Sequence, residues 1–206
     1  MTCITVPVGG FANLSGSTLT GGAYDVYDGT LSFDVGGIVT DLAAAVSLRL
    51  WDADLQFYDP GAGHYVSLES SLKSIAASGS LTLSRTAYSA DTLSIDGTLT
   101  LEETATLQAN HLSVGTGGRI SGSGTIDAPI HNDGTITVAA RSELVISGPV
   151  DGSGTVVIER GERSTVPWQF VGSVLELGAA TAQDVVFSDA SGILILDDPA
   201  HFTGTI

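Results

Sequence analysis

Cysteine, basic residues and long apolar runs are all scarce in this chain of 206 residues. The one cysteine, Cys3, has no partner for an internal disulfide. Packing and the backbone hydrogen-bond ladder must therefore stabilise the fold. No apolar run approaches the roughly 20 residues that a helix needs to cross a bilayer, so we expect no membrane span.

Positive charge is scarce as well. Seven Lys and Arg residues stand against 23 Asp and Glu residues, which gives a formal net charge of −16, and the cations are scattered along the sequence. Phosphate binding needs clustered Lys and Arg, so nucleic acid is not an expected partner. The acidic surface is most simply explained by solubility.

The first ten residues carry neither a basic segment nor the apolar core of about 7–15 residues that defines a secretory signal peptide. At the other end, residues 202–206 read like the start of another repeat. Three interpretations stay open: a cytoplasmic protein, export by another route, and a segment of a larger polypeptide. The last is favoured.

Glycine, by contrast, is abundant, and much of it starts short runs in which polar and apolar residues alternate. Residues 97–159 show this best, beginning with Thr98-Leu99-Thr100-Leu101. Eight glycines open such runs and follow one another at short, nearly even intervals: Gly63, Gly79, Gly97, Gly118, Gly134, Gly154, Gly172 and Gly192. A repeat at so short a period is typical of a solenoid.

A unit of about 18 residues is too short for a strand, a crossover helix and a second strand, which need about 30. It is long enough for two or three short strands joined by tight turns. We therefore predict an all-β fold, a parallel β-helix (β-solenoid) with rungs of roughly 18–20 residues. Ser and Thr should face outward. The residues expected to point inward include Leu99, Leu101, Leu107, Leu112, Val114, Ile120 and Ile126.

No linker or change in composition divides the chain, so residues 1–206 are expected to form a single β-solenoid domain. Its rungs should be less regular over residues 1–62 and regular over residues 63–206. The glycines are expected at the corners, because turns often need a positive φ.

Two stretches also allow a helix. Residues 41–46 could begin one with Asp41 as the N-cap, but a strand is preferred because residues 45–51 alternate again. The apolar spacing of residues 67–77 allows a brief helical turn.

Four stretches together resemble the repeat regions of large bacterial surface proteins, the autotransporter passengers and filamentous adhesin-like proteins. These are GAYDVYDGTLSF at 22–33, IVTDLAAAVSL at 38–48, LKSIAASGSLTL at 72–83 and GSGTI at 122–126. The resemblance implies a right-handed coil, exposed at the bacterial cell surface or secreted. It also implies that a host or matrix surface is the partner.

Two groups of residues suggest binding. In an alternating strand Asp52 and Asp54 would point to the same side, and with Asp59 nearby they could form a weak calcium site. A solvated strand face followed by a turn is the simpler explanation, and no other cofactor is expected. Trp51, Tyr58 and Trp168 could stack on sugars if exposed, although each would equally suit the core.

Enzymatic chemistry finds little support. Parallel β-helices include polysaccharide hydrolases, which need a carboxylic acid and a carboxylate at a set separation. Asp197-Asp198 is the nearest match to their paired aspartates, but the companion motifs are missing and Asp before Pro is a common turn. The histidines, His64, His111, His131 and His201, form no zinc motif. We predict that the chain is not an enzyme.

Three functional hypotheses follow. The favoured one is a non-enzymatic structural, adhesin-type module at the cell surface or secreted. The second is a self-assembling fibre subunit, a homo-oligomer formed through the solenoid ends, because those ends expose unpaired strands. The third is a polysaccharide-binding or polysaccharide-cleaving domain. The irregular residues 51–72 are the best place to look for a site.

Overall fold

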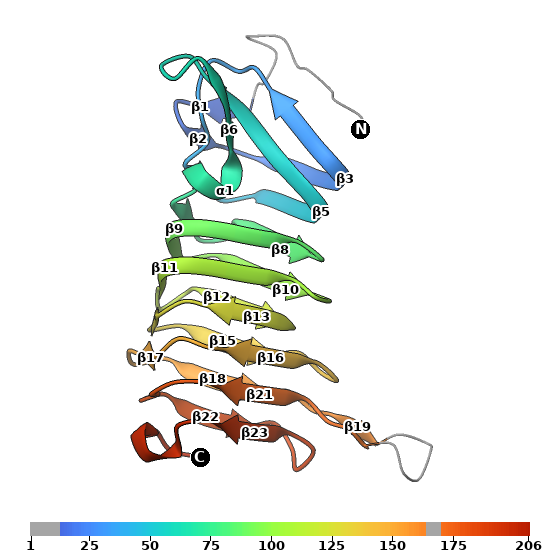
Figure 1. The fold of residues 1–206 in the computed structure, drawn as a ribbon, viewed down its shortest axis with the longest axis vertical. Coiled ribbons are helices and arrows are strands. Elements are labelled where there is room, and N and C mark those ends of the chain that lie inside the picture. Colours follow the sequence, from blue (N-terminus) through green and yellow to red (C-terminus); the bar gives the residue numbers. More distant parts are fainter. Residues whose placement is uncertain (1–12, 164–169) are drawn as a thin grey trace.

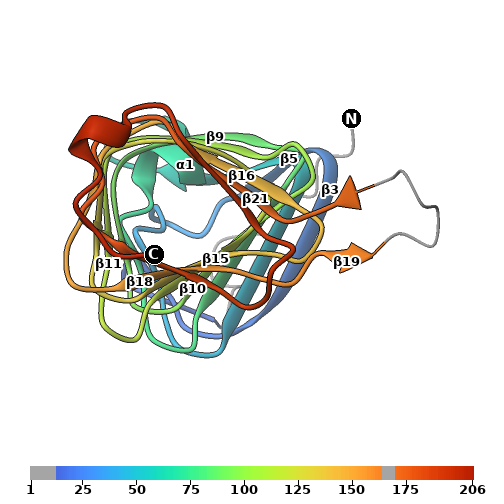
Figure 2. The ribbon, with the colours of Figure 1, turned by 90° about the horizontal axis from the view of Figure 1, so that it is seen from below.

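The alternating runs form the walls of a coil. In the computed structural model, which describes residues 13–163 and 170–206, the chain is a right-handed parallel β-solenoid of about 8 turns. The turns stack along the long axis of the molecule, from the N-terminal end to the C-terminal end (Figure 1). Seen along that axis, the strands enclose a ring (Figure 2). The side chains of the buried hydrophobic cluster fill its interior.

One wall, sheet A, is built from one strand of almost every turn. Its strands pair in parallel in this order: β3 (Gly22–Phe33), β5 (Val46–Asp59), β8 (Ser80–Ser84), β10 (Thr98–Glu102), β12 (Arg119–Gly122), β15 (Thr135–Val138), β18 (Thr155–Ile158) and β22 (Asp184–Phe187). One further strand, β6 (His64–Ser67), pairs antiparallel with the second half of β5.

The remaining walls belong to sheet B. Its main path runs through β1 (Leu14–Ser15), β2 (Thr18–Leu19), β4 (Asp41–Leu42), β7 (Ser74–Ile75), β9 (Ala87–Ile95), β11 (Thr106–Val114), β13 (Gly124–Asp127), β16 (Glu143–Ile146), β21 (Val174–Leu177) and β23 (Ile193–Leu196). β14 (Ile130–Asn132) pairs with β11, and β17 (Val150–Asp151) pairs with β14. The long strands β9 and β11 therefore each run through two walls. In the later turns these two walls are formed by separate strands, such as β13 and β14.

The length of each turn follows from the pairing of sheet A. Across β8, β10, β12, β15 and β18 the turns differ by only a few residues, as the pairs of Ser80 with Thr98 and of Thr98 with Arg119 show. Two turns are longer because they carry insertions. The turn that ends with Ser47 paired to Ser80 includes the hairpin of β5 with β6.

The second insertion lies near the C-terminal end of the coil. It falls in the turn between Thr155 and its partner Asp184. There the chain leaves the wall as the projecting antiparallel pair of β19 (Glu162–Arg163) with β20 (Phe170–Val171), which Figure 2 shows outside the ring. Both insertions leave the register of the ladder unbroken, so the coil continues beyond them.

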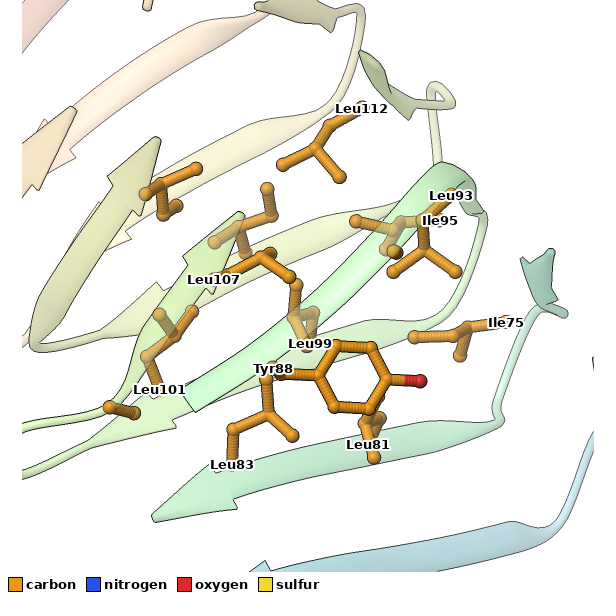
Figure 3. Packing of buried hydrophobic residues seen from close by; sticks show 14 of the residues in the cluster. Ile75, Leu81, Leu83, Tyr88, Leu93, Ile95, Leu99, Leu101, Leu107 and Leu112 are labelled. Atoms are coloured by element: carbon orange, nitrogen blue, oxygen red, sulfur yellow. The ribbon is translucent and has the colours of Figure 1, made fainter. Parts of the chain in front are cut away.

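The core is a set of columns in which each inward residue sits on its equivalent in the next turn. One column of sheet A joins Leu48, Leu81, Leu99, Ile120, Ile136, Val156 and Val185. All seven residues expected to point inward are at most 1% exposed. Figure 3 shows Leu81, Leu99 and Leu107 converging on the interior. Burying one such side chain contributes roughly 1.5–3 kcal/mol, so the columns dominate the stability of the coil.

The glycines that open the strands of sheet A are needed for a reason that the sequence did not suggest. Gly79, Gly97, Gly118, Gly134 and Gly154 do not have a positive φ, so the expected reason is wrong for them. Instead, a Cβ on Gly134 would lie 2.3 Å from the carbonyl oxygen of Gly118, and a Cβ on Gly97 would lie 2.3 Å from that of Gly79. Those carbonyls accept hydrogen bonds from the next turn, as from Thr135 N to Gly118 O at 3.1 Å. The corner is too close-packed for any side chain.

Four exposed residues with left-handed backbone each directly follow one of the residues paired across sheet A as Tyr27, Trp51, Ser84 and Glu102. Asp28, Asp52, Arg85 and Glu103 have φ of 50°, 47°, 53° and 56°. Asp28 and Asp52 lie within β3 and β5 and shift the alternation there by one residue, whereas Arg85 and Glu103 directly follow β8 and β10. Before Asp52 the even-numbered Leu48 and Leu50 are buried, and after it the odd-numbered Leu55 and Phe57 are buried.

The first turns differ from the expected pattern at one glycine. Gly63 opens β6, which is antiparallel to β5, so this glycine does not start a turn of the coil. The helical spacing after Ser67 is confirmed by α1 (Leu68–Ser71), which Ser67 caps by accepting a hydrogen bond from the backbone N–H of Glu69 at 3.3 Å. Asp41 begins the strand β4, as preferred.

Two short helices, α1 and the 3₁₀ turn η1 (Pro199–His201), complete the described elements. In residues 13–163 and 170–206, neither helix nor any other is long and apolar enough to cross a membrane.

The glycine corner gives the first prediction. Replacing Gly134 with Ala should lower the free energy of unfolding by about 1–3 kcal/mol, because the new methyl group collides with backbone that cannot move without breaking the ladder. Denaturant unfolding followed by circular dichroism measures this. Gly37→Ala is the matched control, since nothing lies within 4 Å of the methyl group there. Equal stability of the two variants would contradict the close-packed corner.

Candidate functional site

The alternation that sends leucines inward sends the residues between them to the outer face of sheet A. Because the strands are in register, these outward residues also form columns. One column joins Tyr27, Trp51, Ser84 and Glu102. The next column joins Arg49, Thr82, Thr100, Ser121 and Thr137. We call the surface that these two columns form the outer strip.

An aromatic pair lies at the N-terminal end of the outer strip. The rings of Tyr27 and Trp51 have their centroids 6.2 Å apart and are tilted by 39°. Tyr27 is 55% exposed, so one face of the pair is open to solvent. The guanidinium carbon of Arg49 lies 5.2 Å from the ring centroid of Trp51, a favourable cation–π position.

Charged side chains border the strip further along the coil. Arg49 Nη2 reaches past β8 to Glu102 Oε2 at 2.5 Å. Arg119 Nη2 lies 3.9 Å from Glu159 Oε1. Both pairs are partly exposed, so each contributes little to stability. Their effect is to hold long side chains across the surface of sheet A.

Between these charged side chains the surface is hollowed to a volume of about 570 Å³. Thr100, Ser121 and Thr137 lie along its floor, with the hydroxyl oxygens of Thr100 and Ser121 3.5 Å apart. Glu102, Glu103, Arg119 and Glu159 also line it. The volume is in the range of small-molecule sites.

The outer strip also holds unpaired buried polar atoms. Within residues 13–163 and 170–206, three buried side-chain atoms have no hydrogen-bond partner: Arg49 Nε, Ser84 Oγ and Thr137 Oγ1. All three belong to the two columns of the strip. Ser84 is 0% exposed and Thr137 is 2% exposed. An unpaired buried polar group costs about 1–3 kcal/mol, so their gathering on one surface calls for an explanation.

The structure separates the aromatic residues expected to contact sugar. Trp51 lies in the outer strip. Tyr58 follows the left-handed turn at Asp52 and lies on the hairpin, where its ring meets that of Tyr65 edge-on at 5.4 Å. Trp168 lies outside the described residues. Tyr27, which the sequence argument missed, is the actual neighbour of Trp51.

The three aspartates proposed for calcium are differently placed. Asp54 accepts hydrogen bonds from Ser67 Oγ at 2.6 Å and from Gln56 Nε2 at 2.8 Å, and Asp59 accepts one from the N–H of Gly61 at 2.8 Å. Across the described ranges, no three His, Cys, Asp or Glu side chains gather closely enough to hold a metal ion. Asp52, Asp54 and Asp59 are therefore not brought together as a metal group.

A second hollow of about 620 Å³ follows the bend in β9 and β11. Ser89, Asp91, Gln108, Asn110 and Asp127 line it, and Asn110 Nδ2 donates to Asp91 Oδ1 at 2.6 Å. None of the unpaired buried atoms found in the described ranges belongs to its lining residues. The polar groups of this hollow therefore leave no buried hydrogen-bonding atom for a ligand to satisfy, unlike those of the outer strip.

A third group surrounds His131 on the outside of sheet B. Its Nδ1 lies 2.5 Å from Asp151 Oδ1 and its Nε2 lies 3.3 Å from Asp133 Oδ2. The hydrogen bond to Asp151, followed by the charge of Asp133, raises the pKa of His131. The backbone N–H of Ser153, and then its hydroxyl, donate to Asp133 and lower the pKa of that carboxyl. Ser153 donates to Asp133, not to His131, so this is not the arrangement of a nucleophilic triad.

The raised pKa of His131 has a defined consequence for stability. Its contribution is fully present below the unfolded-state pKa of about 6.5 and is lost as the pH rises through the higher folded-state pKa. Titration of the imidazole by NMR should show a midpoint above that of an unfolded control peptide. Asp151→Asn should lower the midpoint, whereas Asp127→Asn, on another wall, should not. An unchanged midpoint in Asp151→Asn would disprove the assignment.

Comparison with known proteins adds no relative: no protein-family model matches the sequence, and neither curated proteins nor solved structures yield a match.

Proposed function

We propose that this chain is a non-enzymatic structural module of the adhesin type, exposed at the surface of a bacterial cell or secreted from it. The observation that carries the proposal is the unbroken ladder: sheet A runs in register from β3 to β22. The resemblance of residues 22–33 and 72–83 to bacterial surface repeats agrees with it.

A solenoid of this kind suits a spacer. Each turn buries its core residues against the turns on either side, so stiffness extends along the axis without any long-range contact. The same register repeats the outer side chains at the strand spacing of about 4.8 Å. Such a surface can present one contact several times, which favours adhesion through multiple weak interactions.

Two measurements test this role. Small-angle X-ray scattering should fit a single rigid particle, because the turns stack without a hinge in the ladder. Beads coated with the chain should adhere to host cells or to extracellular matrix more than beads coated with an unrelated acidic protein. A flexible scattering profile would refute the spacer, and equal adhesion of both beads would refute the adhesin. Steady turnover of a polysaccharide would refute the non-enzymatic role.

End-to-end association is a second candidate, favoured by the C-terminal turn. β22 and β23 are the last strands of the two sheets, and Val186, Ile193 and Ile195 on them are 48%, 38% and 39% exposed. At the opposite end of sheet B, the antiparallel pair of β1 with β2 folds back over the edge. The edge of β22 is already met by the C-terminal residues, since the N–H of Val185 donates to the carbonyl oxygen of Thr205 at 2.9 Å. We propose that a second copy of the chain pairs with β23, because open parallel edges pair readily.

A charge on this edge should prevent the association. Sedimentation velocity of the unmodified chain should show mass that rises with concentration, and Ile195→Lys should keep the chain monomeric, because a lysine on an edge strand opposes pairing. Val145→Lys, the same change on an inner turn of sheet B, is the control and should associate like the unmodified chain. A monomer at every concentration would contradict self-association while leaving the spacer role intact.

A further inference from the structure

We propose that the outer strip of sheet A binds a neutral glycan chain that lies along the axis of the coil. This inference adds a ligand site to the structural role and does not depend on it. It would hold equally for a spacer, a fibre subunit or an isolated module.

The outer strip contains buried polar atoms that have no hydrogen-bond partner. Ser84 Oγ, Thr137 Oγ1 and Arg49 Nε are buried without partners, and all belong to the two columns of the outer strip. Thr137 also lines the hollow in this surface. Thr137 Oγ1 is buried as the side chain stands, so a ligand lying in the hollow would give this hydroxyl its missing hydrogen bond once the side chain rotates toward the hollow. The strip therefore keeps hydrogen-bonding capacity that the fold itself does not use.

The type of group identifies the ligand chemistry. Thr100, Ser121 and Thr137 present hydroxyls, each of which both donates and accepts, and Glu102 and Glu159 present acceptors. A ligand that matches them must carry many groups that also donate and accept. Sugar hydroxyls have this property at every ring.

The negative charge of the protein favours neutral glycans over anionic ones. The three carboxylates that line the hollow each pair with an arginine, Glu102 with Arg49, Glu103 with Arg85 and Glu159 with Arg119, so the excess of negative charge comes from the rest of the chain. The chain as a whole carries a formal charge of −16. Uronic acids, sulfated sugars and phosphates would be repelled, because like charges oppose association. A neutral glycan meets no such barrier.

The aromatic pair supplies the apolar contact. Tyr27 and Trp51 lie in the same strip as the hollow, and their rings offer an apolar surface with a polar edge. Trp51 is on β5 and Thr137 is on β15, four strand spacings away. At about 4.8 Å per spacing the distance along the axis is roughly 19 Å. A single sugar cannot reach both ends, so the geometry points to a chain of several sugar rings.

The test uses the full chain and defined oligosaccharides. Cellohexaose, laminarihexaose and mannohexaose are the neutral probes, and hexagalacturonate is the anionic probe. Binding is measured by isothermal titration calorimetry, and by tryptophan fluorescence in a Trp168→Phe background so that the signal reports on Trp51. At least one neutral probe should bind saturably, and hexagalacturonate should bind at least about 10-fold more weakly.

Two variants place the binding on the strip. Trp51→Ala should weaken the affinity about 10-fold through loss of the aromatic contact. Thr137→Val removes the unpaired hydroxyl at nearly constant shape, so affinity should fall about 3- to 10-fold while the unfolding midpoint stays the same or rises. Thr92→Val is the matched control, because Thr92 is exposed on the outside of sheet B. Its affinity should remain within about 2-fold of that of the unmodified chain.

Three results would overturn the proposal. The first is no saturable binding of any neutral probe. The second is hexagalacturonate binding as tightly as the neutral probes. The third is unchanged affinity in both Trp51→Ala and Thr137→Val, with each variant folded as judged by circular dichroism. None of these results would bear on the scattering profile or on bead adhesion, so the structural role is judged separately.

Discussion

The parallel hydrogen bonds that join each turn to the next are the interaction on which the rest of this structure depends. They set a constant spacing along the axis, so each residue of a paired strand sits on its equivalent in the neighbouring turn. Leucine on leucine then makes an unbroken core. At the corner, the same bonds bring one turn so close to the next that only glycine fits, as at Gly134 above Gly118. The outer columns follow from the same register, and with them both the spacer role and the glycan site.

The alternating runs predicted the inward columns because burial needs only the pattern of apolar residues and the period of a strand. All residues named in advance for the interior are buried. The role of the glycines was misjudged for the opposite reason. Glycine in a turn usually indicates a positive φ, whereas Gly97 is needed because a carbonyl of the preceding turn lies against it. That carbonyl is distant in sequence, so no local pattern reveals it.

The candidate site shows the same division. Trp51 was identified as an aromatic residue that could meet a sugar, yet its partner Tyr27 comes from the preceding turn and was missed. Thr137 looked like any outward threonine. Only the pairing of β15 with β12 places it beneath Ser121 and in the hollow with Glu102. The sequence did contain one signal for this surface. If each interval between glycines is taken as one turn, the outward Ser and Thr residues of successive turns align in columns.

The sequence by itself determined that the chain is all-β, that it coils with a short period, and that leucine, isoleucine and valine fill the coil. These properties depend on local alternation and on composition. The tertiary structure alone decided where insertions interrupt the coil, which side chains share a surface, and which polar atoms stay without a partner. Those properties depend on contacts between residues one or more turns apart. Because the turns differ in length, from the short one between Arg119 and Thr135 to the long one between Ser47 and Ser80, a sequence period cannot assign such contacts, and only the hydrogen-bonded register does.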